Sequence, residues 1–368
     1  MLPPKTPLSG PYYRLLQRLW RQGSGPARVL FRELGMSRTL GDKLVDQMVR
    51  EGVAGPDSVT GDLALSKDYG SVLGLHIGTK TVTAVVVDFT GGVLLTRDFP
   101  YPDQALVPGI QGLVAQMEPF LRPATVPPLR GVAVSLPGIV DPHRLVLIES
   151  NPLRIFEPIS LSQTLGRALG RPLTAENDAN CCCWGEFAAR RREKLGNFLF
   201  ILAEQRPTVA GRPGSALNLG VGFGLFLNGT VYHGSRFSAG EFKSIFKRDW
   251  GQRSQFSLPD PLIARSYEDP EVGEAVAREL SRNASLLVNI LDLDRVLVSW
   301  PQPVQAPRIQ EILREEIQRN WSYDHPVDCP VELPVLGALA PAYGAAGLHL
   351  ESLFQTADGL APYFPGKN

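Results

Sequence analysis

Residues 71–99 read SVLGLHIGTKTVTAVVVDFTGGVLLTRDF, and this stretch decides the fold of the larger part of the chain. It holds three runs rich in β-branched and aromatic residues, at 72–78, 81–89 and 92–99. A glycine-containing turn separates each run from the next, which is typical of an antiparallel meander. We expect three consecutive strands that open a larger sheet.

Strand-like and helical runs alternate along the rest of the chain. Strands are predicted within RGVAVSLPGIVD (130–141), NFLFILA (197–203) and SALNLGVGFGLFLNGTVYHGS (215–235). Helices are predicted at Ile159 to Leu169, Ala179 to Arg192, Glu271 to Leu291 and Ile309 to Asn320. Strands that alternate with helices pack in layers, so the sequence predicts an α/β fold. At 368 residues the chain is long enough for two or three domains.

The N-terminal segment has a different pattern, with three short amphipathic stretches. They run from Pro11 to Gln22, from Ala27 to Leu34 and from Arg38 to Glu51. Ser37 is a favourable N-cap for the third stretch, and Gly35 permits the tight turn before it. This arrangement is typical of a helix-turn-helix unit. Residues 54–67, with the turn Thr60-Gly61-Asp62, predict the hairpin wing of such a unit.

A helix-turn-helix unit places its recognition helix in the major groove, where the first residues of the helix reach base edges. The candidate DNA-contacting residues are Ser37, Arg38, Thr39, Lys43 and Gln47. Gly41 costs about 1 kcal/mol of helix propensity at a position that a buried aliphatic residue normally fills. The wing carries Asp57 and Asp62, so few phosphate contacts are expected from it. A small helical bundle or a dimerisation arm is the alternative that this pattern leaves open.

Charge is distributed unevenly, although the formal net charge of the chain is zero. Residues 1–67 hold ten Lys or Arg and six Asp or Glu, which places any DNA contact at this end. No apolar run of about 18 residues occurs, so we expect no membrane span, no export signal and a cytoplasmic location. The cysteines match no disulfide or metal-binding spacing, and Cys181, Cys182 and Cys183 are expected to be buried, reduced thiols on a helix.

Seven motifs follow one another in the large region. They are GLHIGTKTVTAVVVDFTGGVL (74–94), GVAVSLPGIVD (131–141), ESNPL (149–153), ENDANCCCWGE (176–186), LNLGVGFGLFLNGTVYHGS (217–235), SAGE (238–241) and LGALAPAYGAAGL (336–348). In this order they resemble the ROK family of sugar kinases and transcriptional repressors, and the N-terminal helices resemble those of its repressor branch. The resemblance implies an actin-like (ribonuclease H-like) fold in which two α/β lobes flank a cleft.

The resemblance also gives the expected domain boundaries. Residues 1–68 would form a winged helix-turn-helix DNA-binding domain, and residues 69–368 a ROK-type, sugar-kinase-like domain. Lobe 1 would take about 69–178 together with a C-terminal helix at about 345–368, and lobe 2 about 179–344.

Four residues match the sugar-facing positions of the family. The resemblance places Asp178 at the catalytic base position, where a carboxylate accepts a proton from a sugar hydroxyl. Asn177, Asn151 and Glu241 match three further sugar contacts. Each also has a simpler interpretation, since Asn177 and Asp178 could cap a helix and Asn151 could stabilise a turn.

The nucleotide-facing motifs depart from the family. His76 stands where the family has a metal-organising Asp, and Gly78, Thr79 and Lys80 replace a Gly-Gly-Thr turn. An imidazole cannot replace a hard oxygen ligand of Mg²⁺. Gly220, Val221 and Gly222 replace the Gly-Thr-Gly of the second phosphate loop. Ser299-Trp300-Pro301 stands where a glycine pair is expected near the adenosine pocket. The chain is therefore expected to lack kinase activity and a bound cofactor.

The family's structural zinc site is also missing from the sequence. Ser244 stands at the position of the zinc-binding histidine, which also touches the sugar in the family, and residues 241–260 contain no cysteine. We therefore expect no metal, and the ligand preference of the cleft is open. Lys80 and His76 add positive charge that would suit a phosphorylated sugar or another anion.

Together these features predict a DNA-binding transcription regulator, a repressor of carbohydrate metabolism, with a non-catalytic sugar-kinase-like effector domain. The expected partners are operator DNA and a sugar or sugar phosphate, with a homodimer or tetramer as the assembly and no membrane. Two alternatives remain open, an ATP-dependent hexose or aminosugar kinase and a ligand-blind DNA-binding dimer.

Overall fold

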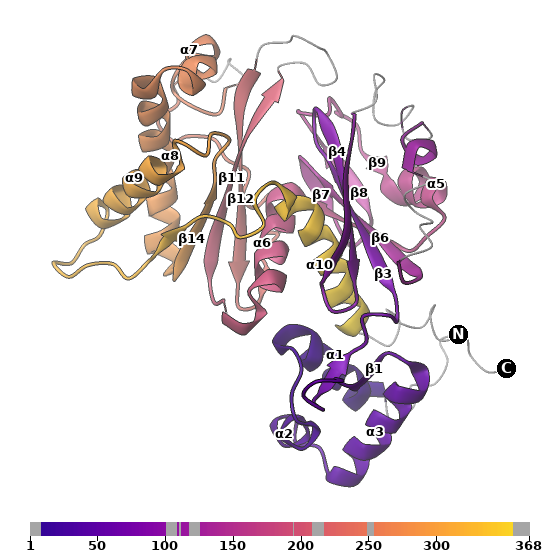
Figure 1. The fold of residues 1–368 in the computed structure, drawn as a ribbon. Coiled ribbons are helices and arrows are strands. Elements are labelled where there is room, and N and C mark those ends of the chain that lie inside the picture. Colours follow the sequence, from indigo (N-terminus) through magenta and orange to yellow (C-terminus); the bar gives the residue numbers. More distant parts are fainter. Residues whose placement is uncertain are drawn as a thin grey trace.

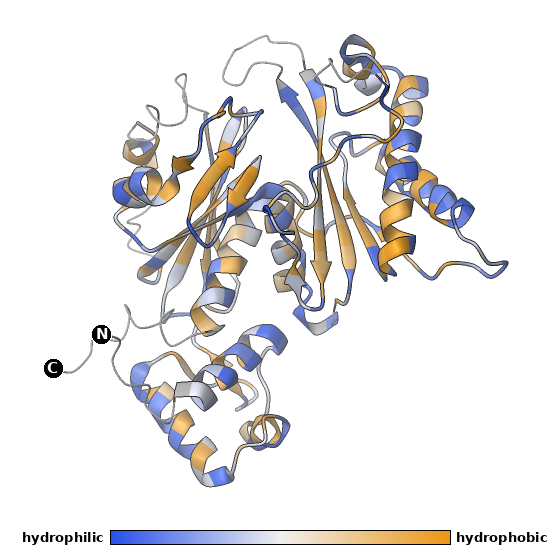
Figure 2. Cartoon of the chain, turned by 180° about the vertical axis from the view of Figure 1, so that it is seen from behind, coloured by the Kyte–Doolittle hydropathy of each residue, from blue (hydrophilic) through white to orange (hydrophobic). Residues whose placement is uncertain are grey.

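The computed structural model of the chain describes residues 9–100, 109, 112–117, 126–193, 195–207, 217–248 and 254–355. Three helices and a hairpin lie at the N-terminal end, and two five-stranded sheets form the larger part (Figure 1). Hydrophobic residues concentrate on the strands of both sheets (Figure 2).

The first sheet begins with the predicted meander. Its strands are β3 (Ser71–Ile77), β4 (Thr81–Asp88), β5 (Val93–Pro100), β6 (Leu129–Leu136) and β10 (Leu173–Asn177). Strands β3, β4 and β5 are antiparallel neighbours, whereas β6 and β10 add on in parallel to give the order β10-β6-β3-β4-β5. A separate three-stranded sheet is formed by β7 (Ile139–Asp141), β8 (Val146–Glu149) and β9 (Ile159–Ser160).

The second sheet repeats the connectivity of the first. Its strands are β11 (Phe198–Pro207), β12 (Leu217–Leu227), β13 (Thr230–Val231), β14 (Arg295–Ser299) and β15 (Val331–Glu332). Again the first three strands are antiparallel neighbours and the last two continue in parallel from the first, in the order β13-β12-β11-β14-β15. The chain therefore builds the same α/β topology twice.

Two helices, α6 (Asp178–Ala189) and α10 (Ala340–Gln355), lie between the sheets (Figure 1). Their backbones touch at Gly344, where a Cβ atom would lie 1.7 Å from the carbonyl oxygen of Cys181. The predicted burial of the cysteine triplet on a helix is confirmed, because Cys181, Cys182 and Cys183 lie in this contact layer of α6.

The remaining helical elements cover the outer faces or join strands. They are η1 (Ser162–Gly166), α5 (Arg167–Leu169), η2 (Arg191–Glu193), α7 (Asp260–Ala264), η3 (Arg265–Tyr267), α8 (Pro270–Leu291), α9 (Ala306–Arg319) and η4 (Gly337–Leu339). The long helices α8 and α9 pack on the outer face of the second sheet (Figure 1).

Two helix predictions need correction. The helix expected at Ile159 to Leu169 begins with the strand β9, because residues 159 and 160 pair with β8, and only then continues as η1 and α5. The C-terminal helix expected at about 345–368 starts earlier, at Ala340, because Pro341 is tolerated in the first turn of a helix. Residues 356–368 lie outside the described part of the chain.

The N-terminal unit contains α1 (Ser9–Gln22), α2 (Ala27–Glu33), α3 (Arg38–Glu51) and the hairpin of β1 (Ala54–Pro56) and β2 (Leu63–Leu65). These elements agree with the predicted helices and hairpin. The Ser37 hydroxyl accepts a hydrogen bond from the amide of Leu40 at 3.3 Å, as expected of the N-cap. Gly35 makes the turn before α3 with a φ of +63°.

The hydrophobic core of the N-terminal unit continues into the first lobe without interruption. Trp20 of α1 packs on Phe354 of α10 with ring centroids 6.0 Å apart, and Phe354 contacts Phe89 after β4. All three aromatic side chains are buried in one cluster. The expected boundary between residues 68 and 69 therefore lies within a shared core.

Gly41, which costs helix propensity, has a packing role. It is buried in α3, and a Cβ atom at this position would lie 2.5 Å from the ring of Phe31. The absence of a side chain lets α2 and α3 approach closely enough for the Phe31 ring to lie over the α3 backbone.

We therefore expect Gly41→Val to destabilise the N-terminal unit by about 1–3 kcal/mol, the usual cost of overpacking a core. Gly10→Ala is the matched control, because a Cβ at Gly10 would meet no atom within 4 Å. Amide hydrogen exchange of α2 and α3 is the measurement. Equal exchange in the Gly41→Val variant and the wild type would contradict this packing role.

Candidate functional site

The ENDAN motif lies where β10 ends and α6 begins, at the base of the space between the two sheets. Asn177 caps α6, because its Oδ1 accepts a hydrogen bond from the amide of Asn180 at 3.1 Å. Its Nδ2 donates to the carbonyl of Gly138 at 3.0 Å. The capping interpretation of Asn177 is thus correct, and both polar atoms of its amide have partners within the protein.

Asp178, the first residue of α6, makes an ion pair that its position in the motif does not reveal. Its Oδ2 lies 3.0 Å from Nη2 of Arg206, and its Oδ1 accepts a hydrogen bond from the amide of Ala179 at 2.9 Å. The side chain of Asp178 is only 3% exposed. Burial raises the pKa of the Asp178 carboxyl, and the Arg206 guanidinium opposes that rise. The carboxylate that would act as a base is therefore occupied by a cation of the same chain.

Arg206 reaches Asp178 from the far end of β11. Its guanidinium also contacts Glu204, with Nη2 3.2 Å from Oε2. The two side chains share one face of β11 because they are two residues apart in a strand. Gly220 on the neighbouring strand makes room for Arg206, since a Cβ there would lie 2.6 Å from its Cδ.

The structure places Gly220, Val221 and Gly222, expected at a degenerate second phosphate loop, in a strand. These residues lie inside β12 and pair with Glu204, Ala203 and Leu202 of β11. Because the two strands continue beyond the glycines to Pro207 and Leu217, the glycine amides belong to a sheet and not to a turn. Arg206 and Glu204 lie on the extension of this hairpin.

His76 closes the cluster from the first lobe. Its Nε2 lies 3.8 Å from Oε1 of Glu204, and its Nδ1 lies 3.2 Å from the hydroxyl of Ser135. The contact joins β3 of the first sheet to β11 of the second. Gly78 and Lys80 belong to the turn that follows β3, where Thr79 is buried and the Lys80 side chain is exposed.

The residues on the nucleotide side do not fit a Mg²⁺-nucleotide. The position of a metal-organising carboxylate holds His76, and the Asp178 carboxylate is paired with Arg206. Near the expected adenosine pocket, the indole of Trp300 is buried in the second lobe and donates a hydrogen bond to Gln305 at 2.9 Å. We therefore derive no catalytic step through a nucleotide.

Ser244, at the position of the family's zinc-binding histidine, is held by hydrogen bonds within the protein. The Ser244 hydroxyl accepts from the Asn283 amide at 3.3 Å and from the backbone of Phe246 at 3.2 Å. The ammonium of the buried Lys247 donates to the carbonyl of Phe256 at 3.4 Å. The backbone amide of Lys247 donates to the carbonyl of Ser244, so this segment already holds one buried cation and does not suit a second. Among the described residues, no cluster of three or more His, Cys, Asp or Glu could bind a metal.

Glu241 and Asp178 both lie next to the backbone of Gly222. Gly222 bridges to Glu241, and a Cβ at Gly222 would lie 4.0 Å from Oδ1 of Asp178. Desolvation and the nearby Asp178 raise the pKa of the Glu241 carboxyl, with a smaller contribution from Glu149. Asn151 is exposed in the turn that follows Glu149. The structure thus brings Asp178 and Glu241 together and places Asn151 near the same edge.

A second pair joins the buried Glu176, next to Asn177 in the chain, to the partly exposed His233. Nε2 of His233 is 2.6 Å from Oε2 of Glu176, while Oε1 of Glu176 accepts from the amide of Asn177 at 2.7 Å. Burial opposes protonation of His233, but Glu176 outweighs it and raises the pKa of the imidazole. The pair holds the turn that carries Asn177 and Asp178.

The sequence contains only a faint signal for these additional residues. Glu204 and Arg206 have opposite charges and i, i+2 spacing after the apolar run 197–203, which is compatible with one face of a longer strand. Nothing in the spacing of Glu176 and His233 indicates their contact.

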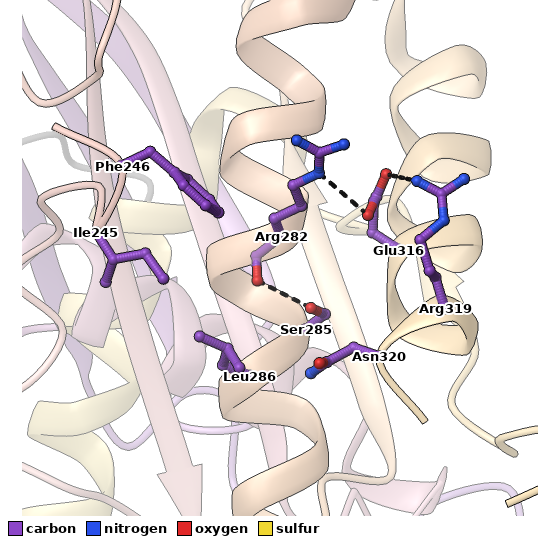
Figure 3. A pocket seen from close by; sticks show the side chains of 8 residues that line it. All are labelled: Ile245, Phe246, Arg282, Ser285, Leu286, Glu316, Arg319 and Asn320. Carbon is purple, nitrogen blue, oxygen red and sulfur yellow. Dashed lines mark hydrogen bonds and ion pairs between the residues drawn. The ribbon is translucent and has the colours of Figure 1, made fainter. Parts of the chain in front are cut away.

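A hollow of about 220 Å³ lies elsewhere, between the loop at residues 245–246 and the helices α8 and α9 (Figure 3). Its wall includes Arg282 and Arg319, which both pair with Glu316. None of the predicted site residues lines this hollow. In the described parts of the chain, we find no helix with the length and apolar character needed to cross a membrane.

The candidate DNA-contacting residues lie on one end of α3. Arg38, Thr39 and Lys43 are exposed, and Nε of Arg38 lies 3.6 Å from Asp42. Ser37 is used as the N-cap, and Gln47 is only partly exposed because its Nε2 donates to Glu51 at 2.8 Å.

Comparison with known proteins gives sequence relatives of two kinds. Residues 72–246 match the ROK family model. A beta-glucoside kinase of Listeria monocytogenes is 30% identical over 177 residues, which cover 48% of this chain and 53% of the kinase. A xylose repressor of Bacillus spizizenii is 19% identical over 181 residues, which cover 49% of this chain and 43% of the repressor. The chain thus matches about half the length of these curated relatives or less.

A solved structure matches nearly the whole chain. It is a ROK family transcriptional regulator described as a homolog of the E. coli MLC protein, with 16% sequence identity and a TM-score of 0.70. The match covers 96% of this chain and 97% of that chain, so it includes the N-terminal helices. At this identity the likeness shows the fold, which is an α/β, actin-like fold.

We expect Arg206→Met to lower the free energy of unfolding by about 3 kcal/mol or more, because it leaves the buried Asp178 carboxylate without its counterion. Adding Asp178→Asn to that variant should recover much of the loss, since an amide carries no charge. Arg171→Met, at an exposed arginine, is the matched control. Denaturant unfolding measures all four proteins. An unchanged midpoint for Arg206→Met, or no recovery in the double variant, would show that the pair does not stabilise the cleft.

Proposed function

Since residues 72–246 match the ROK family model, we propose that this chain is a DNA-binding transcription regulator, a repressor of carbohydrate metabolism, whose sugar-kinase-like domain binds a ligand without phosphorylating it. The observation that carries the proposal is the ion pair between Asp178 and Arg206 at the family's base position.

The ion pair with Arg206 argues against Asp178 acting as a general base. A general base must accept a proton from the substrate hydroxyl, and a guanidinium next to a carboxylate lowers the affinity of that carboxylate for a proton. In this chain Oδ2 of Asp178 contacts the Arg206 guanidinium, and Oδ1 accepts from a backbone amide. To free the carboxylate, Arg206 would have to leave two carboxylates at once, because it also pairs with Glu204.

Recognition of DNA is proposed for the N-terminal unit, acting as a winged helix-turn-helix. Exposed Arg38, Thr39 and Lys43 at the start of α3 would contact base edges and phosphates in the major groove. The hairpin would add little, because Asp57 in its loop accepts hydrogen bonds from the amides of Val59 and Thr60 and keeps its negative charge. Two copies of the chain would read a symmetric site.

The ligand proposed for the cleft is a sugar without a phosphate group. Asp178, Glu204 and Glu241 carry three carboxylates around a single guanidinium, so a phosphate entering this space would meet net repulsion. A neutral polyol can donate hydroxyl hydrogens to the carboxylates, and an amino group would add attraction. This argument favours a free or amino sugar over a sugar phosphate.

The rival function is an ATP-dependent sugar kinase, which the 30% identity to a beta-glucoside kinase favours. That relative is matched over only 48% of this chain, and the departures at His76 and Trp300 concern the nucleotide side. A ligand-blind DNA-binding dimer is the other alternative.

We expect the full-length protein to bind DNA from its own promoter with sequence preference and with an affinity that falls as salt rises. Lys43→Gln should weaken binding to all sequences similarly and reduce the salt slope by about 1, as expected for the loss of one phosphate contact. Arg171→Gln is the matched control. Fluorescence anisotropy of labelled DNA is the measurement.

The same titration, repeated with glucose, xylose, glucosamine, cellobiose and glucose 6-phosphate, separates a sensor from a ligand-blind dimer. At least one free or amino sugar should change DNA affinity by about fivefold or more, a typical allosteric coupling. Binding of DNA that is insensitive to sequence and salt would remove the proposed function. A response to glucose 6-phosphate alone would overturn the proposed ligand class.

A further inference from the structure

The helix that begins at the candidate ligand site ends at the N-terminal unit. Asp178 is the first residue of α6, and Arg191 lies two residues beyond its last residue, Ala189, at the start of η2. The 12 residues of α6 span about 18 Å at 1.5 Å per residue. Only the C-cap residue Arg190 separates the helix from Arg191, so the two ends of this segment are connected over a short stretch of chain.

Arg191 makes two contacts with α1 and one with the turn between β4 and β5. Its guanidinium lies 4.3 Å from the ring centroid of Trp20, and Nη1 donates to the carbonyl of Trp20 at 2.8 Å. Nη2 donates to the carbonyl of Thr90, in the turn between β4 and β5, at 2.6 Å. The Arg191 side chain thus connects η2, which follows α6, to α1 and to the edge of the first sheet.

The second interlobe helix reaches the same place. The hydroxyl of Tyr343 on α10 donates to the carbonyl of Gly91 at 2.8 Å. Gly91 has a φ of +85°, and a Cβ there would lie within 3.4 Å of Tyr343, Arg191 and Trp20. Side chains from η2, α10 and α1 therefore converge on a turn where only glycine fits.

Further along α10, Glu351 holds the end of α1. Its Oε1 accepts hydrogen bonds from Nε of Arg21 at 2.8 Å and from Nε2 of Gln17 at 3.1 Å. Glu351 is 1% exposed, so the pair with Arg21 is anchored on the α10 side. These contacts make α1 part of the effector domain surface.

The two interlobe helices are packed too closely to slide independently. At Gly344 the α10 backbone touches the carbonyl of Cys181, and at Gly185 a Cβ would lie 2.9 Å from the carbonyl of Ala340. Backbone contact without intervening side chains leaves no room for one helix to repack against the other.

We propose that α6 and α10 act as a single rigid coupling element between the cleft and the N-terminal helices, with Arg191 as the positioning residue that transmits movement of Asp178 to α1. The regulatory meaning of this coupling rests on the proposed function. The mechanical link does not, because it can be measured without DNA or a sugar.

Amide hydrogen exchange of the full-length chain tests the link. Arg191→Met should speed exchange across α1 by about tenfold or more, because it removes a cation–π contact and two charge-assisted hydrogen bonds. Exchange in α9, on the opposite face of the second lobe, should stay within twofold of wild type. Arg171→Met is the matched control and should leave α1 unchanged.

The coupling itself requires a second comparison. Asp178→Asn removes the charge at the start of α6 and should change α1 exchange at least threefold in the wild-type background, but not when Arg191→Met is also present. Trp20→Phe, which keeps an aromatic core residue, replaces Arg191→Met if the latter fails to fold.

An equal effect of Asp178→Asn in both backgrounds, or α1 exchange within twofold of wild type in Arg191→Met, would overturn the proposal. If the exchange results are as expected but the protein binds no promoter DNA, the proposed function fails and the coupling element remains.

Discussion

The candidate site is organised around one buried ion pair, between Asp178 and Arg206. The Arg206 guanidinium lies 3.0 Å from the carboxylate of Asp178, which is buried at the start of α6. Leaving the buried Asp178 carboxylate without Arg206 would cost much free energy. The pair therefore fixes the ends of β10 and β11 relative to each other. The extension of the β11–β12 hairpin carries Arg206 to Asp178. It also places Glu204 against His76 of the first lobe, so the two sheets are held across the cleft.

The rest of the architecture follows from two copies of one topology with two helices packed between them. The sheets share the order of an antiparallel meander extended by two parallel strands. The glycines of α6 and α10 allow backbone contact between the two helices. Arg191 of η2 and Glu351 of α10 both bond to α1, so the N-terminal helices are attached to the centre of the molecule.

Much of this organisation could be predicted from the sequence. The meander at 71–99, the three N-terminal helices and the N-cap at Ser37 have local signals and are confirmed. The resemblance to the ROK family, based on seven ordered motifs, is also confirmed. Arg206 could not be found, because the apolar run of β11 ends before it and its partner is distant in the sequence. For the same reason Gly220 to Gly222 were assigned to a loop, since glycines in a strand that make room for a neighbouring arginine look the same in sequence as glycines in a turn. Gly41 is a similar case, because only the position of Phe31 explains it.

The central proposal is that the pairing of Asp178 with Arg206 leaves this domain a sensor and not a catalyst. Its most direct test is the transfer of labelled γ-phosphate from ATP, with Mg²⁺ and a panel of hexoses, pentoses, amino sugars and β-glucosides, by the full-length wild-type protein. The account predicts no sugar phosphate above the protein-free background with any of these acceptors. Enzyme-dependent formation of a sugar phosphate, proportional to protein concentration, would contradict it.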